Sequence, residues 1–208
     1  IVAKLGKFIL NGGLYRGAKP VLWSVVEKTA LAEAEVEYKD HTSNTIFTKF
    51  PIIKSAIKSL VDNSSIVIWT TTPWTIPGNR GIAYSANNEY LCLLIKKVEP
   101  DSEAMVNDKV VVAESLLEEF CQGCHISEYN IVDKFNGSFL EGTHCIHPFS
   151  GKGYDFEVPL LPADFVDMET GTGFVHIAPG HGYDDWVLGM EYGLPVPETV
   201  LGNGLYTD

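Results

Sequence analysis

The sequence predicts a mostly β domain with peripheral helices, an α+β fold in which one sheet is closed or strongly curved. Short apolar runs rich in β-branched and aromatic residues recur along the chain, separated by Gly, Pro and Asp. Runs with helical spacing are few by comparison. With 208 residues, of which 45% are hydrophobic and 11% aromatic, the chain can bury a core as one domain.

The first residues predict a helix that precedes this sheet. Ile1, Leu5 and Phe8 recur at helical spacing, and Asn-Gly-Gly at residues 11–13 favours a helix end. Because the chain begins with Ile rather than Met and residues 201–208 add no closing element, we expect a segment of a longer protein. The expected divisions are a leading helix and linker at residues 1–30, a β core at 31–200 and an exit segment at 201–208.

Two strands and a short helix are predicted before residue 62. Residues 32–38 alternate Glu with Ala, Val and Tyr, which predicts a half-buried strand although Ala and Glu individually favour helix. Residues 45–50 predict a strand that ends at Pro51, because proline lacks the backbone N–H. Residues 53–61 predict one or two helical turns on the surface.

Eight further strands and two helices are predicted in the remainder of the chain. One helix covers residues 114–120, and the other begins at Asp184 and continues through apolar positions at helical spacing. The strands are short apolar runs. They are expected at residues 65–69, 81–85, 90–96, 109–113, 126–135, 145–149, 156–160 and 174–177.

The composition restricts the classes of function. The formal net charge of -12 argues against non-specific nucleic-acid binding, since phosphates are neutralised by clustered Lys and Arg, but it is compatible with gripping one nucleotide end. Without a membrane-length apolar run or a signal peptide, we expect a soluble, cytoplasmic protein with no membrane partner. Its four cysteines, Cys92, Cys121, Cys124 and Cys145, are expected to stay reduced.

Residues 171–186 contain most of the candidate site chemistry. A short strand around His176 ends at a proline, and a glycine-rich turn leads into a helix whose first turn carries two aspartates. Such a strand end is a common place for a site. The alternative is an ordinary loop before a helix capped by Asp184. The residues expected to gather here are His176, His181, Asp184 and Asp185.

Residues 70–80 offer a second set of polar groups. Four threonine hydroxyls and the Asn79 carboxamide lie in this loop, and two prolines stiffen it. Threonine needs an adjacent base to act as a nucleophile, and no Gly-x-Ser-x-Gly or Cys–His arrangement is present, so attack by an oriented water is favoured. The alternative is ordinary turn chemistry, with the threonines finishing a strand and Asn79 forming a turn.

Two groups of residues contain side chains that can bind metal ions. His176 and His181 flank a Pro-Gly turn instead of lying four residues apart on one helix, so the spacing disfavours zinc. Cys121 and Cys124 form a single CxxC, with two histidines and a cysteine at residues 144–147, which is a weak signal for structural zinc. No metal ligand is predicted.

The two motifs together resemble a known family. Residues 69–80, Trp-Thr-Thr-Thr-Pro-Trp-Thr-Ile-Pro-Gly-Asn-Arg, and residues 171–186, Gly-Thr-Gly-Phe-Val-His-Ile-Ala-Pro-Gly-His-Gly-Tyr-Asp-Asp-Trp, closely resemble the editing domain of isoleucyl-tRNA synthetase, a class I aminoacyl-tRNA synthetase. Residues 17–20 and 30–38 match the same family, so the resemblance covers essentially the whole chain. Thr-Pro-Trp at residues 72–74 points to the isoleucyl branch, since related valyl and leucyl enzymes carry a Thr-Thr-Arg-Pro type of loop.

The resemblance implies a closed β-barrel core of the type found in valyl, isoleucyl and leucyl synthetase editing domains. It also implies hydrolysis of valine wrongly attached to isoleucine tRNA, and of valyl adenylate, by an oriented water. A pocket that accepts isoleucine cannot strongly reject valine, because one methylene is worth only about 1–3 kcal/mol, a magnitude established on isoleucine-specific synthetases themselves. A second, smaller pocket solves this problem. Gly78, where many members have Ala, and the Cys121–Cys124 pair depart from the family pattern.

The resemblance also implies roles for individual residues. Asp185 is expected to bind the substrate ammonium and His176 to shape the pocket, while the threonines and Asn79 line it and orient water. The expected catalytic residues are Thr70, Thr71, Thr72, Asn79, His176 and Asp185, and the expected substrate-binding residues are Asp185, His176, Thr71, Thr72, Trp74, Gly173, Phe174 and His181.

No cofactor is expected for editing, and ATP and any zinc belong to the parent enzyme outside this chain. The expected partners are the 3′ end of isoleucine tRNA, the valine moiety of mischarged tRNA or valyl adenylate, and the rest of a monomeric synthetase. Without HIGH and KMSKS signatures, the chain is expected to have no synthetic activity alone. Two other classes stay open, a metal-dependent hydrolase and a non-catalytic module that binds the tRNA 3′ end.

Overall fold

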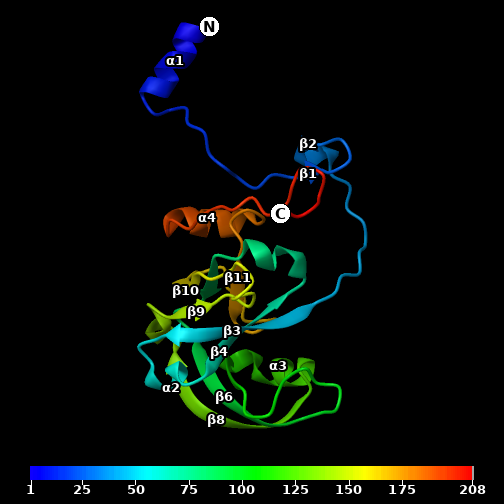
Figure 1. Ribbon diagram of the computed structural model, residues 1–208, viewed down its shortest axis with the longest axis vertical. Helices are drawn as coiled ribbons and strands as arrows, with labels where there is room; N and C mark the ends of the chain where they lie inside the picture. The colour runs from blue at the N-terminus through cyan, green and yellow to red at the C-terminus, as the bar shows by residue number, and fades with distance from the viewer. Residues whose placement is uncertain (208) are drawn as a thin grey trace.

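A nine-stranded mixed sheet forms the centre of the molecule (Figure 1), and the computed structural model describes residues 1–207. The strand order is β11-β5-β10-β9-β3-β4-β7-β6-β8, with parallel pairing only between β10 and β5 and between β4 and β7. The strands are β3 (Ile46–Lys54), β4 (Ser64–Thr70), β5 (Gly81–Tyr84), β6 (Glu89–Val98), β7 (Lys109–Ala113), β8 (Ile126–Asn136), β9 (His144–Ile146), β10 (Glu157–Pro162) and β11 (Phe174–Ile177).

Few helices accompany this sheet, which confirms the predicted mostly β class. Short 3₁₀ turns cover Glu33–Glu35, Pro73–Gly78, Glu114–Leu116 and Gly137–Leu140. None of the helices described in residues 1–207 is long and apolar enough to cross a membrane. The α-helices are α1 (Val2–Leu10), α2 (Lys58–Val61), α3 (Leu117–Gly123) and α4 (Tyr183–Glu191).

The sheet is strongly curved. β11 lies against β4, although four strands separate them in the hydrogen-bonded order. The backbone N–H of Ala113, at the end of β7, donates to the carbonyl of Thr172 over 2.8 Å, which ties the loop before β11 to this part of the sheet. Within residues 1–207, no hydrogen-bonded ladder closes the sheet into a ring. The sheet is therefore an open, curved mixed sheet in which the edge strand β11 packs on β4.

The core fills both faces of the central strands. Residues of β4, β6 and β7 are buried on both faces, which explains why these strands are nearly continuous apolar runs. On one face Phe120 of α3 packs edge-on against Phe47, with ring centroids 5.7 Å apart. Around β5 and β11 a separate cluster includes Ile177 and Leu188, so α4 is fixed to the strand end where the candidate site was expected.

Of the three elements predicted before residue 62, two are corrected by the structure. Residues 32–38 form no strand; Glu35 turns back so that its carboxylate accepts the Ala32 N–H over 2.7 Å, and this local bond stabilises a 3₁₀ turn. β3 continues through Pro51 to Lys54, because beyond Pro51 it leaves β4 and pairs with β9. The helix predicted within residues 53–61 is confirmed as one turn, α2, which begins at Lys58 because β3 continues to Lys54.

The later predictions are confirmed, with differences at the ends. The helix at 114–120 is a 3₁₀ turn followed by α3, the strand at 145–149 is the shorter β9, and residues 70–80 contain a 3₁₀ turn that begins at Pro73. The remaining seven of the eight later strands correspond to β4, β5, β6, β7, β8, β10 and β11, and the helix predicted at Asp184 corresponds to α4.

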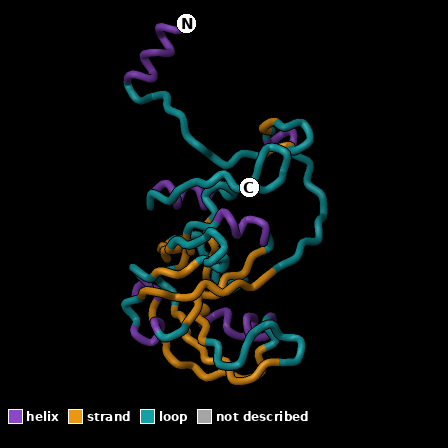
Figure 2. Tube along the Cα trace, viewed as in Figure 1, coloured by secondary structure: helices purple, strands orange, loops and turns teal. Residues whose placement is uncertain are grey.

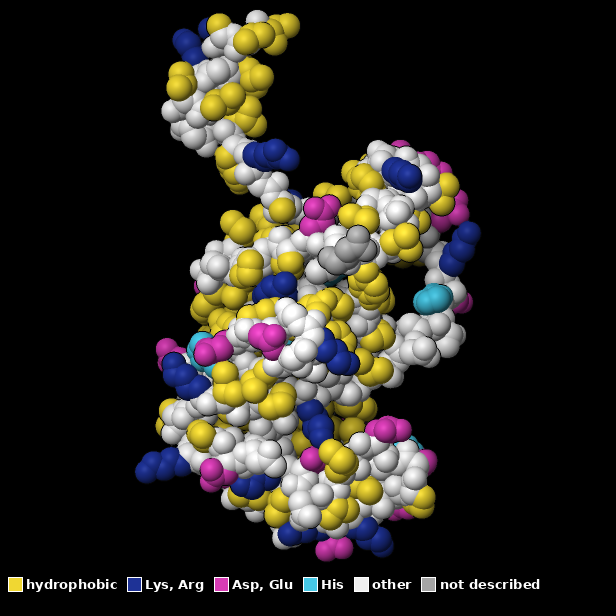
Figure 3. All heavy atoms as spheres, viewed as in Figure 1, with side chains coloured by type: hydrophobic (Ala, Val, Ile, Leu, Met, Phe, Trp, Pro, Cys, Tyr) yellow, Lys and Arg dark blue, Asp and Glu magenta, His cyan; other side chains and the backbone are white. Residues whose placement is uncertain are grey.

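Residues 1–45 lie outside the nine-stranded sheet and are mainly loop (Figure 2). The predicted opening helix is confirmed as α1, which has no buried residue and carries exposed apolar side chains (Figure 3). A small hairpin of β1 (Trp23–Ser24) and β2 (Thr29–Ala30) follows. The division of the chain at residues 30 and 200 stays a prediction.

Candidate functional site

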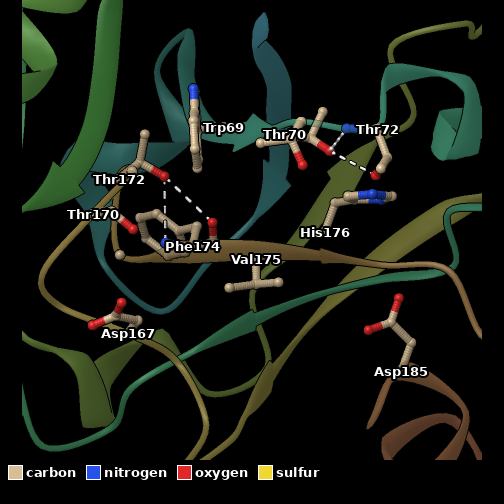
Figure 4. A pocket seen from close by; sticks show the side chains of 13 residues that line it. Trp69, Thr70, Thr72, Asp167, Thr170, Thr172, Phe174, Val175, His176 and Asp185 are labelled. Atoms are coloured by element: carbon tan, nitrogen blue, oxygen red, sulfur yellow. Dashed lines mark hydrogen bonds between the residues drawn. The ribbon is translucent and has the colours of Figure 1, made fainter. Parts of the chain in front are cut away.

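A pocket of about 310 Å³ lies between the end of β4 and β11 (Figure 4). β4 and the loop after it supply the threonines, while β11 and the loop before it supply the opposite side. The first turn of α4 adds one carboxylate. The lining residues are Trp69, Thr70, Thr71, Thr72, Asp167, Thr170, Gly171, Thr172, Gly173, Phe174, Val175, His176 and Asp185.

The threonine hydroxyls are oriented by local hydrogen bonds. Thr70 Oγ1 accepts the backbone N–H of Thr72 over 3.1 Å and lies 3.3 Å from the Thr72 hydroxyl. Thr75 Oγ1 donates to the carbonyl of Thr72 over 2.9 Å. Pro73 begins the 3₁₀ turn that follows, so its ring fixes φ at the point where the chain leaves the strand. Thr71 and Thr72 are exposed, whereas Thr70 is buried.

His176 is a neutral imidazole with a defined tautomer. Its Nε2 lies 3.0 Å from Thr75 Oγ1, whose hydrogen is already donated to the Thr72 carbonyl. Nε2 must therefore carry the proton, and Nδ1 is left as an acceptor that is buried without a hydrogen-bond partner in the described structure. Burial, reinforced by nearby His181 and His147, lowers the pKa of His176 to about 4.

Asp185 brings a carboxylate into the pocket without a basic partner among residues 1–207. Its Oδ2 accepts the backbone N–H of Ala178, just after β11, over 2.8 Å. Burial raises the pKa of Asp185, and the Ala178 bond opposes that shift. A Cβ at Gly182 would lie 2.9 Å from Cγ of Asp185, so the glycine leaves room for the carboxylate.

The expected capping role of Asp184 is wrong. Gly182 is the N-cap of α4, and the cap has no side-chain hydrogen bond. Asp184 is exposed in the first turn and lines a different pocket, beside Asp164 and Glu191. The two neighbouring aspartates therefore face different environments, because successive helical residues are rotated by about 100°.

Three expected site residues do not line the pocket. Asn79 is fully buried, and its Nδ2 donates to the carbonyl of Gly81 over 2.8 Å, so its carboxamide holds the turn before β5. Trp74 is 53% exposed and packs edge-on against His181, with ring centroids 5.3 Å apart. His181 Nε2 lies 2.8 Å from the hydroxyl of Thr199. Gly173 and Phe174, also expected as binding residues, do line the pocket.

Besides Gly171, five lining residues were not among the predicted site residues. The signal for the loop before β11 was the pair Gly171 and Gly173, which have φ values of +84° and +78° and mark a sharply turned backbone. Asp167 precedes this loop by several residues and carries no signal of its own. The missed residues are Trp69, Asp167, Thr170, Thr172 and Val175.

The cysteines do not form a metal site in the described residues. Burial raises the pKa of Cys121 to about 11 and that of Cys124 to about 12, so both are neutral thiols at neutral pH. His147 uses both ring nitrogens, with Nε2 3.0 Å from the Ile76 carbonyl and Nδ1 accepting the Phe149 N–H over 3.1 Å. Across residues 1–207, no three His, Cys, Asp or Glu side chains are grouped so that they could hold a metal ion.

Comparisons with known proteins agree with this geometry. A family model described as "Leucyl-tRNA synthetase, editing domain" matches residues 53–205. The chain is 52% identical over 207 residues to the isoleucine–tRNA ligase of Pelagibacter ubique and 50% identical over 207 residues to that of Gluconobacter oxydans. These alignments cover 100% and 99% of the chain but only 22% of each relative, so the chain spans about a fifth of their length.

Two solved structures share the fold. The crystal structure of GlLeuRS-CP1 matches with a TM-score of 0.53 and 19% identity, covering 74% of this chain and 66% of that one. The editing domain of the P. knowlesi cytosolic leucyl-tRNA synthetase matches with a TM-score of 0.51 and 15% identity, covering 69% of this chain and 61% of the other. Because the sequence identities are below 20%, these two matches show only that the fold is shared.

Proposed function

The chain belongs to the family of aminoacyl-tRNA synthetase editing domains, and from this we propose that it hydrolyses valine from mischarged isoleucine tRNA and cleaves valyl adenylate. The isoleucine–tRNA ligases among its relatives support the isoleucine branch. The observation that carries the proposal is the Asp185 carboxylate, which has no basic partner in the described structure and shares one pocket with the threonine hydroxyls and His176.

In the proposed reaction, Asp185 binds the α-ammonium group of the aminoacyl ester. An ammonium supplies the charge that this carboxylate lacks, through a charge-assisted hydrogen bond. The Thr71 and Thr72 hydroxyls, exposed at the opposite side, hold a water against the ester carbonyl. The water oxygen bonds to the carbonyl carbon, the ester C–O bond breaks, and a water proton ends on the ribose oxygen. Valine and the free tRNA end are the products.

His176 is proposed as a wall of the side-chain pocket and not as the general base. With a pKa of about 4 the imidazole is a weak proton acceptor at neutral pH. Its hydrogen bond to Thr75 fixes the ring. Isoleucine, which is longer than valine by one methylene, would have to displace this ring, and overpacking of this kind costs about 1–3 kcal/mol.

Membership of the editing-domain family also supports the proposed partners. They are the 3′ end of isoleucine tRNA and the remainder of a monomeric, cytoplasmic synthetase, to which residues 1–30 and 201–208 would connect. We propose that hydrolysis needs no metal or other cofactor, since the proposed chemistry uses a carboxylate, hydroxyls and water. The closed barrel implied by the resemblance is proposed to form by packing of β11 on β4, without a ladder between them.

The proposal is tested by incubating the chain with valine-charged and with isoleucine-charged isoleucine tRNA and measuring ester loss. Valine ester should be lost well above the spontaneous rate, while isoleucine ester is retained. Tight binding without turnover would instead support the non-catalytic tRNA-end module. Turnover that is lost in chelator and restored by zinc would support a metal-dependent hydrolase.

A further inference from the structure

An aromatic pair lies on the first turn of α4, the turn that also carries Asp185. The rings of Tyr183 and Trp186 have centroids 5.9 Å apart and are inclined by 32°. Tyr183 is 57% exposed and Trp186 is half-buried. Asp185, which lines the pocket, belongs to the same turn, so the pair lies within about one helical pitch, roughly 5 Å along the axis, of the proposed ammonium site.

The linker from α1 places a cation on this pair. Trp186 Nε1 donates to the carbonyl of Ala18 over 2.8 Å, which fixes the linker against α4. The Lys19 ammonium consequently lies 5.0 Å from the Tyr183 ring centroid and 5.7 Å from that of Trp186. Lys19 and nearby Arg16 have no carboxylate within salt-bridge distance in residues 1–207.

Two acidic side chains of α4 have different neighbours from the aromatic pair. Asp184 and Glu191 line a separate pocket together with Asp164, whereas Tyr183 and Trp186 contact the basic linker. Because the chain as a whole carries a net charge of -12, attraction of a phosphate to this surface depends on the local cations Lys19 and Arg16. Aromatic rings that stack bases, with cations that meet phosphates, are the usual means of holding single-stranded nucleic acid.

We propose that Tyr183, Trp186 and Lys19 bind the single-stranded RNA immediately upstream of the terminal nucleotide whose ester enters the pocket. A base stacks on the exposed part of the Tyr183 ring, and the Lys19 ammonium contacts a backbone phosphate. Trp186 is a positioning residue that holds the linker and supports the tyrosine ring. This inference rests on the proposed function for the identity of the RNA, but it assigns a separate binding surface outside the hydrolytic pocket.

The test compares two substrates that differ only in the upstream RNA. Valine-charged isoleucine tRNA contains it, and 2′(3′)-O-valyl adenosine lacks it. Tyr183→Ala should raise KM for the charged tRNA at least about fivefold, the lower end for loss of one base stack, with kcat unchanged. Hydrolysis of valyl adenosine should stay at the wild-type rate, and Tyr183→Phe, which keeps the ring, should behave as wild type.

A matched control is Tyr192→Ala, at the C-terminal end of the same helix, where the side chain is 42% exposed. It removes an exposed tyrosine about 13 Å along the axis and should leave both substrates unaffected. Lys19→Ala should weaken binding of uncharged isoleucine tRNA and reduce the salt slope of log affinity by about one.

Two results would overturn the inference: an unchanged KM for charged tRNA in Tyr183→Ala, or equal losses on both substrates. The first would leave the surface free for packing against another protein segment, and the second would place Tyr183 in the pocket itself. If the wild-type chain hydrolyses neither substrate, the proposed function fails. The affinity of uncharged tRNA for wild type and Tyr183→Ala then still decides the RNA surface, and equal affinities reject it.

Discussion

At the scale of single residues, the site depends on how its few polar groups are paired. Thr75 is the clearest case, because its hydroxyl donates to Thr72 and so forces His176 to be the donor at Nε2. That leaves Nδ1 as a buried acceptor. Asp185 is the complementary case, since only one of its oxygens has a partner, the Ala178 N–H. Both side chains thus keep one polar atom without a hydrogen-bond partner in the described structure.

Asp185→Ala should remove most deacylation while the chain stays folded. The ammonium loses a charge-assisted hydrogen bond worth about 1.5–3 kcal/mol, which corresponds to a rate loss of roughly 10- to 150-fold. The matched control is Asp184→Ala, an exposed neighbour on the other side of α4, which should be nearly silent. Circular dichroism checks the fold, and full activity in folded Asp185→Ala would contradict the assignment.

His176→Ala should begin to hydrolyse isoleucine-charged tRNA. Removing the wall relieves an overpacking penalty of about 1–3 kcal/mol, so the ratio of valine to isoleucine deacylation should fall by roughly tenfold to a hundredfold. The two rates are measured at fixed pH and tRNA concentration. If both rates drop together and the ratio stays constant, His176 has no role in specificity.

His176 should also make stability depend on pH. Its pKa is about 4 in the folded chain against about 6.5 when unfolded, so between these values only the unfolded state binds the proton. Stability should therefore fall as the pH drops from 7 towards 4, by up to about 3 kcal/mol from this group. Asp185, whose pKa is raised, contributes in the opposite sense as it becomes protonated.

The measurement is urea unfolding of wild type and His176→Gln at pH 7 and pH 5. Because the variant lacks the titrating group, its stability should change less between the two pH values. The rate of deacylation should show no inflection near pH 6.5 that depends on His176. An equal pH dependence of stability in both proteins would show that His176 is not held neutral by burial.

At the scale of elements, the loop before β11 sets the width of the pocket. It presses on β7 so closely that a Cβ at Gly173 would lie 2.4 Å from Cβ of Ala113, whereas a Cβ at Gly171 would meet nothing nearer than 3.6 Å. Both glycines have positive φ. Substituting each glycine in turn therefore distinguishes the stability cost of a positive φ, common to both, from the cost of close packing, which only Gly173 has.

Gly173→Ala should destabilise the chain more than Gly171→Ala. Both substitutions carry the left-handed backbone cost of about 1–2 kcal/mol. Only Gly173→Ala adds overpacking of about 1–3 kcal/mol against Ala113. Urea unfolding at neutral pH measures the difference, and equal destabilisation would mean that the loop moves away from β7 without cost.

At the scale of the whole molecule, curvature of one sheet brings the two motifs together. β4 and β11 are far apart in the strand order, yet they lie against each other, and α4 is fixed to the end of β11 through Leu188 and Ile177. The pocket is thus built between parts of the chain about a hundred residues apart. The cysteines lie outside this pocket: Cys92 on β6, Cys121 on α3, Cys124 at its C-cap and Cys145 on β9.

Removal of metal ions by a chelator should leave the deacylation rate of the whole chain unchanged. The proposed chemistry uses a carboxylate and hydroxyls, and in residues 1–207 no three His, Cys, Asp or Glu side chains are grouped so that they could hold a metal ion. The check is the metal content of the purified chain together with its rate before and after dialysis against chelator. A stoichiometric metal whose removal abolishes turnover and whose return restores it would contradict this expectation.

The sequence alone determined the mostly β class, most strands and the family, because short apolar runs and two dense motifs are local signals. It also placed the threonines, His176 and Asp185 in one site. Only the tertiary structure decided the rest. Packing of β11 on β4 added Asp167 and Trp69 to the pocket, and pairing with β9 continued β3 past Pro51. Those outcomes depend on contacts between residues distant in sequence, which no local pattern encodes. Asn79, held by its bond to Gly81, and Asp184, which lines another pocket, needed the side-chain geometry to be placed.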